Sequence, residues 1–372
     1  MPLDARVAVV PEAEAQFAFQ DVTIDDPGPH EVRVRVVASG VCHTDASVRD
    51  GILPASFPQV LGHEGSGIID AVGSHVTDLK VGDPVVMTYG SCGRCECCAE
   101  GDPAYCEKFV ALNFEGERQG KGDAVFGGTD LTAAFFQQSS FGTYALAHER
   151  NVVKVPEDVD IKLLGPLGCG IQTGAGTVLN TLKPQAGQTI AVFGVGSVGL
   201  SAIMAARVAG CATIIAVDLQ PERLKMAQEL GATHTVNSND EDPADAVRAA
   251  TNGKGAHYAL ECTGLAKVAG QANDALRQRG TLAIVGAPPG GTDYAFDAND
   301  LILTGRRIVG AVEGDSIVKL FIPRLIELWQ QGRFPFDRLV KEYAFEDLNQ
   351  AFADMHDGKT IKPIVVMPGQ GG

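Results

Sequence analysis

Nine cysteines stand in this chain of 372 residues, and the spacing of several suits a metal ion. Cys92, Cys95, Cys98 and Cys106 follow the pattern C-x2-C-x2-C-x7-C, with Cys97 as an additional thiol inside it. Four thiolates on one short loop suit tetrahedral zinc and leave no open coordination position, as in a structural site. An iron–sulfur cluster and a group of thiols without metal remain alternatives.

Three more segments place a cysteine or a histidine beside glycine, namely GVCHTD at 40–45, GHEG at 62–65 and GCG at 168–170. Two thiolates and one imidazole would give zinc three protein ligands and leave a fourth position for a substrate, as in a catalytic site. Each segment alone is as well explained by ordinary packing. The interpretation therefore depends on their combination with a dinucleotide-binding motif.

That motif is G-x-G-x-x-G, formed by Gly194, Gly196 and Gly199 between a short apolar strand and a helical stretch. Such glycines permit a tight turn, a close approach of pyrophosphate to the backbone, and close packing of the helix. Asp218 ends the next strand, and a carboxylate there binds the ribose hydroxyls of NAD and repels the 2′-phosphate of NADP. The motif therefore predicts NAD, although the nearby Arg223 weakens the distinction, and a purely structural glycine turn is the alternative.

These residues need two kinds of scaffold. Residues 1–150 are rich in turns and alternate charged with apolar residues in short runs, which predicts strands. After about residue 170, strands alternate with helices, which predicts a parallel sheet covered on both faces. The expected strands are 31–38, 67–72, 83–87, 189–193, 213–218, 233–237, 257–263 and 281–286, and the expected helices are 197–209, 221–230, 243–251, 267–278 and 316–331.

Composition narrows the classes of partner. The hydrophobic fraction is 45%, and 46 acidic against 30 basic residues give a formal charge of −16. A nucleic-acid partner is disfavoured, because it normally requires a basic face. The first residues contain no apolar signal segment, and no run of 18 apolar residues predicts a membrane span. Cysteines used in this way are typical of a reducing compartment, so a cytoplasmic protein is expected.

The segments GVCHTD, GHEGSG, the four-cysteine loop, LGCGIQTG and GVGSVG follow one another in this order. In this respect the chain resembles the zinc-containing medium-chain alcohol dehydrogenases over its whole length. Through Tyr89–Gly93 and Asn113–Gly116 it most resembles the bacterial aryl-alcohol (benzyl alcohol) branch. The resemblance implies an α/β protein with a β-rich GroES-like catalytic domain, 1–171 and 312–372, and a doubly wound Rossmann NAD domain, 172–311.

The resemblance also implies roles for single residues. Cys42, His63 and Cys169 would hold the catalytic zinc, and the four-cysteine loop the structural zinc. Thr44 would accept the proton of the alcohol, Asp45 would orient His63, and Glu64 would lie behind the metal. Further cofactor contacts would come from His43, Val285 and Lys362. The substrate pocket would be lined by Leu53, Thr88, Phe141 and Ala287.

The implied reaction is hydride transfer between a primary aryl or allylic alcohol and NAD, with an alkoxide stabilised by zinc. Ser47 stands where many relatives have a histidine that continues the proton relay. The alternatives are a thiol-dependent formaldehyde dehydrogenase, with Arg49 or Arg118 binding the carrier, and a non-enzymatic zinc or redox sensor. A homodimer or homotetramer is expected, with 301–312 as the pairing region. The preferred alcohol and the physiological direction stay open.

Overall fold

The computed structural model describes residues 3–119 and 125–369. They form two compact units. The first contains the described residues up to Cys169, together with Ile317–Leu325 and those from Asp337 onward. The second contains Gly170–Ser316 and Ile326–Phe336. The chain thus leaves the first unit after Cys169, returns to it at Ile317–Leu325, and returns a second time from Asp337 onward.

Two sheets build the first unit. The smaller is four-stranded, in the order β4 (Gln59–Val60), β1 (Leu3–Val10), β2 (Ala18–Ile24) and β7 (Phe126–Gly127). The larger has the order β16 (Val340–Ala344), β17 (Lys362–Val366), β3 (Glu31–Gly40), β5 (Gly65–Val72), β6 (Pro84–Met87) and β9 (Val152–Lys154), with β8 (Tyr144–His148) also paired to β3. Strand β17 comes from the end of the chain and pairs antiparallel with β3, with Ile364 opposite Gly40.

Strand β3 differs from its sequence-based interpretation. Its alternating charged and apolar residues predict a strand with one exposed face, but nearly every residue of β3 is buried. The charges are buried as ion pairs: Arg118 donates to both carboxylate oxygens of Glu31 at 2.7 and 2.6 Å, and Arg33 donates to Asp70 at 2.7 Å. Paired charges can occupy a strand that is covered on both sides, since each partner compensates the other's desolvation.

Short helices complete the first unit. They are α1 (His43–Arg49), α2 (Glu96–Glu100), α3 (Phe109–Asn113) and α11 (Leu348–His356), with 3-10 turns at Pro103–Tyr105, Phe135–Gln137, Glu149–Asn151, Ile161–Leu163, Gly165–Gly168, Phe336–Leu339 and Phe345–Asp347. Helix α10 (Val318–Gln330) contains Pro323 and has residues in both units. An apolar cluster that includes Val7, Ile24, Val60 and Phe126 forms a core beneath the smaller sheet.

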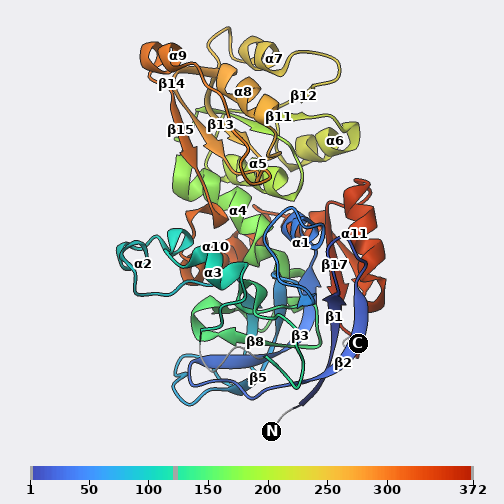
Figure 1. Cartoon of the computed structure of the whole chain (residues 1–372). Coiled ribbons are helices and arrows are strands. Elements are labelled where there is room, and N and C mark those ends of the chain that lie inside the picture. The colour runs from blue at the N-terminus through green and yellow to red at the C-terminus, as the bar shows by residue number, and fades with distance from the viewer. Residues whose placement is uncertain (1–2, 120–124, 370–372) are drawn as a thin grey trace. The chain divides into compact units, whose positions relative to one another are not determined.

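The second unit is a six-stranded parallel sheet (Figure 1). Its order is β12 (His234–Asn237), β11 (Thr213–Asp218), β10 (Thr189–Phe193), β13 (Ala256–Glu261), β14 (Leu276–Ile284) and β15 (Arg307–Gly310). The helical segments are α4 (Gly170–Gly176), a π-helical turn (Thr177–Leu182), α5 (Ser197–Val208), α6 (Pro221–Leu230), α7 (Pro243–Ala250), α8 (Ala266–Asp274), α9 (Ala298–Thr304) and a 3-10 turn at Glu313–Asp315. The strand order reverses at β10, and this is the doubly wound order of dinucleotide-binding sheets.

Most of the expected elements of this unit are present. Strands β10 and β11 and helix α6 have the predicted bounds, and α5 ends one residue earlier. One boundary was wrong: the helix expected over 267–278 ends at Asp274, and β14 begins at Leu276. Leu276 pairs with Ala256 of β13, and the register shifts before Tyr258. The pairing of neighbouring strands thus decided this boundary.

No helix within 3–119 and 125–369 is long and apolar enough to cross a membrane.

Candidate zinc and dinucleotide sites

The first site begins where β3 ends. Gly40 closes the strand, and Cys42 is the residue before helix α1, with Thr44 and Asp45 in the first turn. The Asp45 carboxylate accepts the backbone N–H of Cys42 at 3.2 Å, so it caps the helix that carries it. The short helix therefore holds the Cys42 thiol at a defined place beside the strand end.

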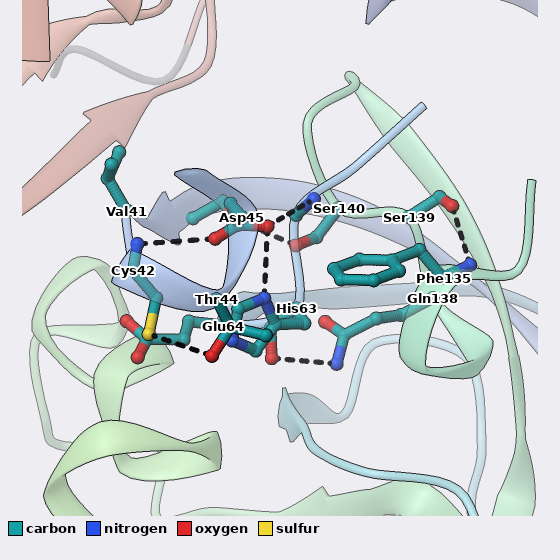
Figure 2. A network of polar contacts seen from close by, with 12 residues as sticks. Val41, Cys42, Thr44, Asp45, His63, Glu64, Phe135, Gln138, Ser139 and Ser140 are labelled. Carbon is teal, nitrogen blue, oxygen red and sulfur yellow. Dashed lines mark hydrogen bonds and ion pairs between the residues drawn. The ribbon is translucent and has the colours of Figure 1, made fainter. Parts of the chain in front are cut away.

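The same carboxylate also holds His63. Asp45 Oδ1 accepts the N–H of Gly62 and Nδ1 of His63, both at 3.0 Å, and Asp45 and His63 are fully buried (Figure 2). With Nδ1 bonded to this carboxylate, the neutral form of the ring carries its lone pair on Nε2. A carboxylate in this position fixes the tautomer of a metal-binding histidine and raises its basicity.

Nε2 of His63 is buried and has no hydrogen-bond partner in the described part of the chain. It belongs to a group in which the ligand atoms of Cys42, His63, Glu64 and Cys169 all lie within 4.8 Å of one another. A buried nitrogen without a partner is costly, and a metal ion held by two thiolates and this imidazole would satisfy it. The arrangement fits zinc with one position open to a small molecule.

Cys169 reaches this group through a tightly packed turn. It follows the 3-10 turn Gly165–Gly168, and Thr88 Oγ1 donates to the carbonyl oxygen of Gly168 at 2.6 Å. The pKa of the Cys42 thiol is held well below its usual range by the hydrogen bond from Cys169, against the effect of burial, and the Lys362 ammonium acts in the same direction. Because zinc binds thiolates, a lowered pKa favours metal binding near neutral pH.

Lys362 occupies an unexpected position. It was expected near the pyrophosphate of the cofactor, but its side chain is 1% exposed and its Nζ donates to Glu64 Oε1 and Oε2 at 2.8 and 3.0 Å. Nζ also donates to the carbonyl oxygen of Val41 at 3.2 Å, which uses the third proton of the ammonium group. The ammonium is thus buried and bonded to Glu64 and Val41, so the structure does not support the expected contact with a phosphate.

The Glu64 carboxylate fits here because residue 40 is glycine. A Cβ at Gly40 would overlap Glu64 Oε2. Burial raises the pKa of the Glu64 carboxyl, and the ammonium of Lys362 opposes this rise. Glu64 in turn raises the pKa of Lys362 although burial lowers it. The Lys362 ammonium therefore places one positive charge beside the anionic groups of the site.

Sequence reasoning missed Gln138. Its Nε2 donates to the carbonyl oxygen of His63 at 2.9 Å (Figure 2). Nε2 also donates to the Thr88 carbonyl at 3.2 Å, and Oε1 accepts the N–H of Gly65 at 3.0 Å. Phe136 stacks on the His63 ring with the centroids 4.5 Å apart. The sequence signal for Gln138 was the polar run at 137–140 after Phe136. A polar run does not indicate which backbone groups its side chains will bind.

The four-cysteine loop forms the second group. The sulfurs of Cys92, Cys95, Cys98 and Cys106 lie within 4.8 Å of one another, and Cys97 is outside this group. The N–H of Cys92 points at the Cys106 sulfur at 3.2 Å, and that of Cys95 at the Cys92 sulfur at 3.4 Å. Backbone N–H groups of Glu107 and Cys98 lower the pKa of Cys95 to about 6. The geometry fits a closed four-thiolate zinc site.

The glycine motif lies in the second unit. Gly194 has a φ of +84° at the end of β10, and a Cβ at Gly199 would overlap the carbonyl oxygen of Gly194. A Cβ at Gly196 would meet no described atom within 4 Å, which leaves the backbone open to a ligand. Asp218 Oδ2 accepts the N–H of Val195 at 2.8 Å and so ties the end of β11 to the glycine turn. Arg223 is half-buried near the start of α6.

The remaining expected residues are scattered. His43 and Ala287 are exposed, Leu53 and Val285 are half-buried, and the N–H of Val285 donates to the Glu261 carbonyl. Thr88 and Phe141 are fully buried, so the described residues cover both side chains and neither lines an open pocket. Phe141 packs against Phe17 and Phe352 with centroid distances of 5.7 and 6.0 Å.

Comparison with known proteins agrees with this geometry. Residues 28–157 match the alcohol dehydrogenase GroES-like domain, and residues 197–329 match the zinc-binding dehydrogenase family. A geraniol dehydrogenase of Castellaniella defragrans is 42% identical, over 98% of both chains. The chain belongs to the zinc-binding medium-chain alcohol dehydrogenases.

Solved structures extend this result. An alcohol dehydrogenase zinc-binding domain protein from Burkholderia ambifaria is 53% identical, with a TM-score of 0.96 and coverage of 99% of this chain and 100% of the other. A benzyl alcohol dehydrogenase from Acinetobacter calcoaceticus is 50% identical, with a TM-score of 0.95 and coverage of 98% and 99%. The predicted GroES-like and Rossmann architecture is thereby confirmed.

The Lys362–Glu64 pair can be tested by Lys362→Met. Removing one partner leaves a buried charge uncompensated, so we expect a loss of about 3–5 kcal/mol in the free energy of unfolding. We also expect a chelator to remove the metal of the Cys42 site faster, while the metal of the four-cysteine site is retained. Lys359→Met, which changes an exposed lysine, is the matched control. Unchanged stability and unchanged metal retention would refute the role given to Lys362.

Proposed function

We propose that the protein oxidises a primary aryl or allylic alcohol to the aldehyde with NAD, or runs the reverse reaction. The observation that carries this proposal is the buried, unpartnered Nε2 of His63 beside the thiols of Cys42 and Cys169. When bound there, zinc supplies a Lewis acid that lowers the pKa of an alcohol. The chain's own residues hold that ion, orient its histidine ligand and move the proton.

Thr44 is the residue proposed to accept the alcohol proton. Its Oγ1 lies 3.8 Å from Cys42 Sγ, so the hydroxyl stands beside the metal ligands, and it is half-buried. Ser47 stands one turn further along the same helix and is also half-buried. Because residues three apart share a helix face, Ser47 or water next to it is the proposed continuation of the relay.

Cofactor binding is proposed at the glycine turn of the second unit. The open backbone at Gly196 would receive the pyrophosphate, and Asp218 would accept the ribose hydroxyls. The carboxylate of Asp218 already accepts the N–H groups of Leu219 and Gln220 at 2.8 and 2.9 Å, which holds it at the end of β11. A fixed carboxylate favours NAD over NADP. Contacts from His43, Arg223 and Val285 remain part of this proposal.

The proposed substrate class is based on two similar proteins whose names state the alcohol they oxidise. Geraniol is an allylic alcohol and benzyl alcohol an aryl one, and the chain is 42% and 50% identical to their dehydrogenases. Of the expected pocket residues in the first unit, half-buried Leu53 keeps accessible surface for an apolar substrate.

The two cations proposed for the thiol-dependent formaldehyde reaction give it no support. Of its two proposed carrier-binding cations, Arg118 is 2% exposed and bound to Glu31. Arg49 donates to Asp50 at 2.7 Å, and its guanidinium stacks over Phe352 at 4.9 Å. Both are engaged within the chain.

A homodimer or homotetramer remains part of the proposal. Strand β15 is the edge of the parallel sheet, and the α9 side chains of Ile302 and Leu303 just before it are 76% and 81% exposed. Exposed apolar side chains beside a free sheet edge are typical of protein–protein contacts. A cytoplasmic location is proposed because cysteines spaced to bind metal ions are typical of a reducing compartment.

A panel of aryl, allylic and aliphatic alcohols, assayed with NAD and with NADP, tests the proposed function. We expect benzyl, cinnamyl and geranyl alcohols to have a kcat/KM with NAD at least about tenfold above that of ethanol, since each buried methylene contributes about 1–3 kcal/mol. A preference for short aliphatic alcohols would refute the substrate class. Failure of NAD turnover with every alcohol would refute the activity.

Asp218→Asn tests the cofactor assignment. It keeps an oxygen that can accept the N–H of Val195 but removes the negative charge that repels a 2′-phosphate. We expect the ratio of kcat/KM for NADP over NAD to rise by about tenfold or more. Asp240→Asn, in an exposed turn of the same unit, is the matched control. An unchanged ratio would contradict the role of Asp218.

Thr44→Ala and Ser47→Ala separate the two hydroxyls of the proposed relay. We expect Thr44→Ala to lower kcat by about 10²–10⁴-fold, as loss of a positioned proton acceptor does, and Ser47→Ala to have a much smaller effect. Thr44→Ser retains a hydroxyl and should recover most of the activity. Equal losses in Thr44→Ala and Ser47→Ala would argue against Thr44 as the first acceptor.

A further inference from the structure

A group of histidines on the first unit shares no residue with either cysteine-containing group. His30 precedes β3, His75 follows β5, and His148 ends β8. His30 Nδ1 lies 2.7 Å from Glu149 Oε1, and His30 Nε2 lies 3.3 Å from His75 Nδ1. Along the sequence His75 is 45 positions and Glu149 is 119 positions away from His30, so only the fold brings the three side chains together.

The backbone around these histidines is tightly connected. The N–H of His75 donates to the Pro29 carbonyl at 2.8 Å, and that of Glu149 donates to the His30 carbonyl at 2.9 Å. Gly73 packs so closely that a Cβ there would overlap the Gly28 carbonyl. The two imidazoles are therefore carried by segments whose relative position is set by direct hydrogen bonds, which is the preorganisation that a ligand site requires.

The roles of the ring nitrogens follow from Glu149. Its carboxylate accepts from Nδ1 of His30, which leaves Nε2 of that ring as a lone pair facing His75. A carboxylate behind a histidine in this way is the usual support of a metal-binding imidazole. His75 is exposed, so its proton can move to Nε2 and be solvated, which would free Nδ1 as a second ligand.

The separation of the two nitrogens fits a shared ion. Two Zn–N bonds of about 2.05 Å at a tetrahedral angle of about 109° place the nitrogens about 3.3 Å apart. The observed distance between the two nitrogens is 3.3 Å, which matches this separation. The rings meet at 67° with centroids 4.9 Å apart, so the pair is not stacked face to face.

The neighbouring charges permit a cation. The His148 ring lies nearly parallel to His30, 6.0 Å away, and its Nδ1 accepts the N–H of Arg150 at 3.2 Å. Burial and the Arg150 guanidinium lower the pKa of His148, so this ring adds no positive charge near neutral pH. The nearby Glu31 carboxylate is already paired with Arg118, and Glu149 remains the negative charge behind His30.

We propose that His30 Nε2 and His75 Nδ1 form a two-histidine site for a borderline divalent transition-metal ion such as Zn²⁺. The His30 side chain is 52% exposed, so water can complete the coordination of the ion. Imidazole nitrogens suit Zn²⁺, Cu²⁺ and Ni²⁺, and not Mg²⁺ or Ca²⁺. With two protein ligands, the site would bind more weakly than either cysteine-containing site and exchange its ion with solution.

The test uses the full chain loaded with two zinc ions and titrated with ZnCl₂ in a calorimeter, with bound zinc counted after equilibrium dialysis. We expect a third zinc ion to bind near neutral pH. His30→Gln and His75→Gln should each abolish this binding, and Glu149→Gln should weaken it by about tenfold or more. His356→Gln, which replaces an exposed histidine on α11, should leave it unchanged.

Two results would overturn the proposal. One is that no third zinc ion binds to the loaded chain, which would mean that the two histidines form only a hydrogen bond. The other is that a third ion still binds to the His30→Gln/His75→Gln double variant, which would place it elsewhere, for example at Cys97. Because the readout is the number of bound ions, a failure of the proposed alcohol oxidation would not change the result.

Discussion

The buried carboxylate of Asp45 is the contact on which the metal site depends. It accepts hydrogen bonds from Cys42 N, Gly62 N and His63 Nδ1, and so joins the start of α1 to the segment before β5. Without it, two ligands that are far apart in sequence would lose their relative position, and His63 would be free to change tautomer. The cost of burying this charge is offset by three donors, which also make the arrangement specific.

Charge balance explains why Lys362 comes in from the last strand of the larger sheet. If Cys42 and Cys169 bind a divalent ion as thiolates, they and the carboxylates of Asp45 and Glu64 would carry more negative charge than that ion neutralises. Strand β17 pairs with the end of β3 and thereby places the Lys362 ammonium against Glu64. The end of the chain thus belongs electrostatically to a site whose ligands lie in its first half.

The two cysteine-containing groups differ in how far apart their residues lie in the sequence. Cys92, Cys95, Cys98 and Cys106 lie within one loop, so their spacing alone predicted a closed site, and the structure brings their sulfurs together. Cys42, His63 and Cys169 come from three separate segments, and each segment alone resembled ordinary packing. Their assembly depends on β3, β5 and the 3-10 turn after Ile161–Leu163, which only the larger sheet positions.

The sequence by itself determined the elements with local causes: β10, β11 and α6, the glycine turn and the closed cysteine loop, because apolar periodicity, capping and ligand spacing act within a few residues. The tertiary structure decided which side chains are buried and which groups they contact. It buried Lys362 against Glu64, enclosed Thr88 and Phe141, brought Gln138 to His63, and set His30 beside His75. The physical reason is that the burial and pairing of a polar side chain depend on segments that pack against it, and these are distant in sequence.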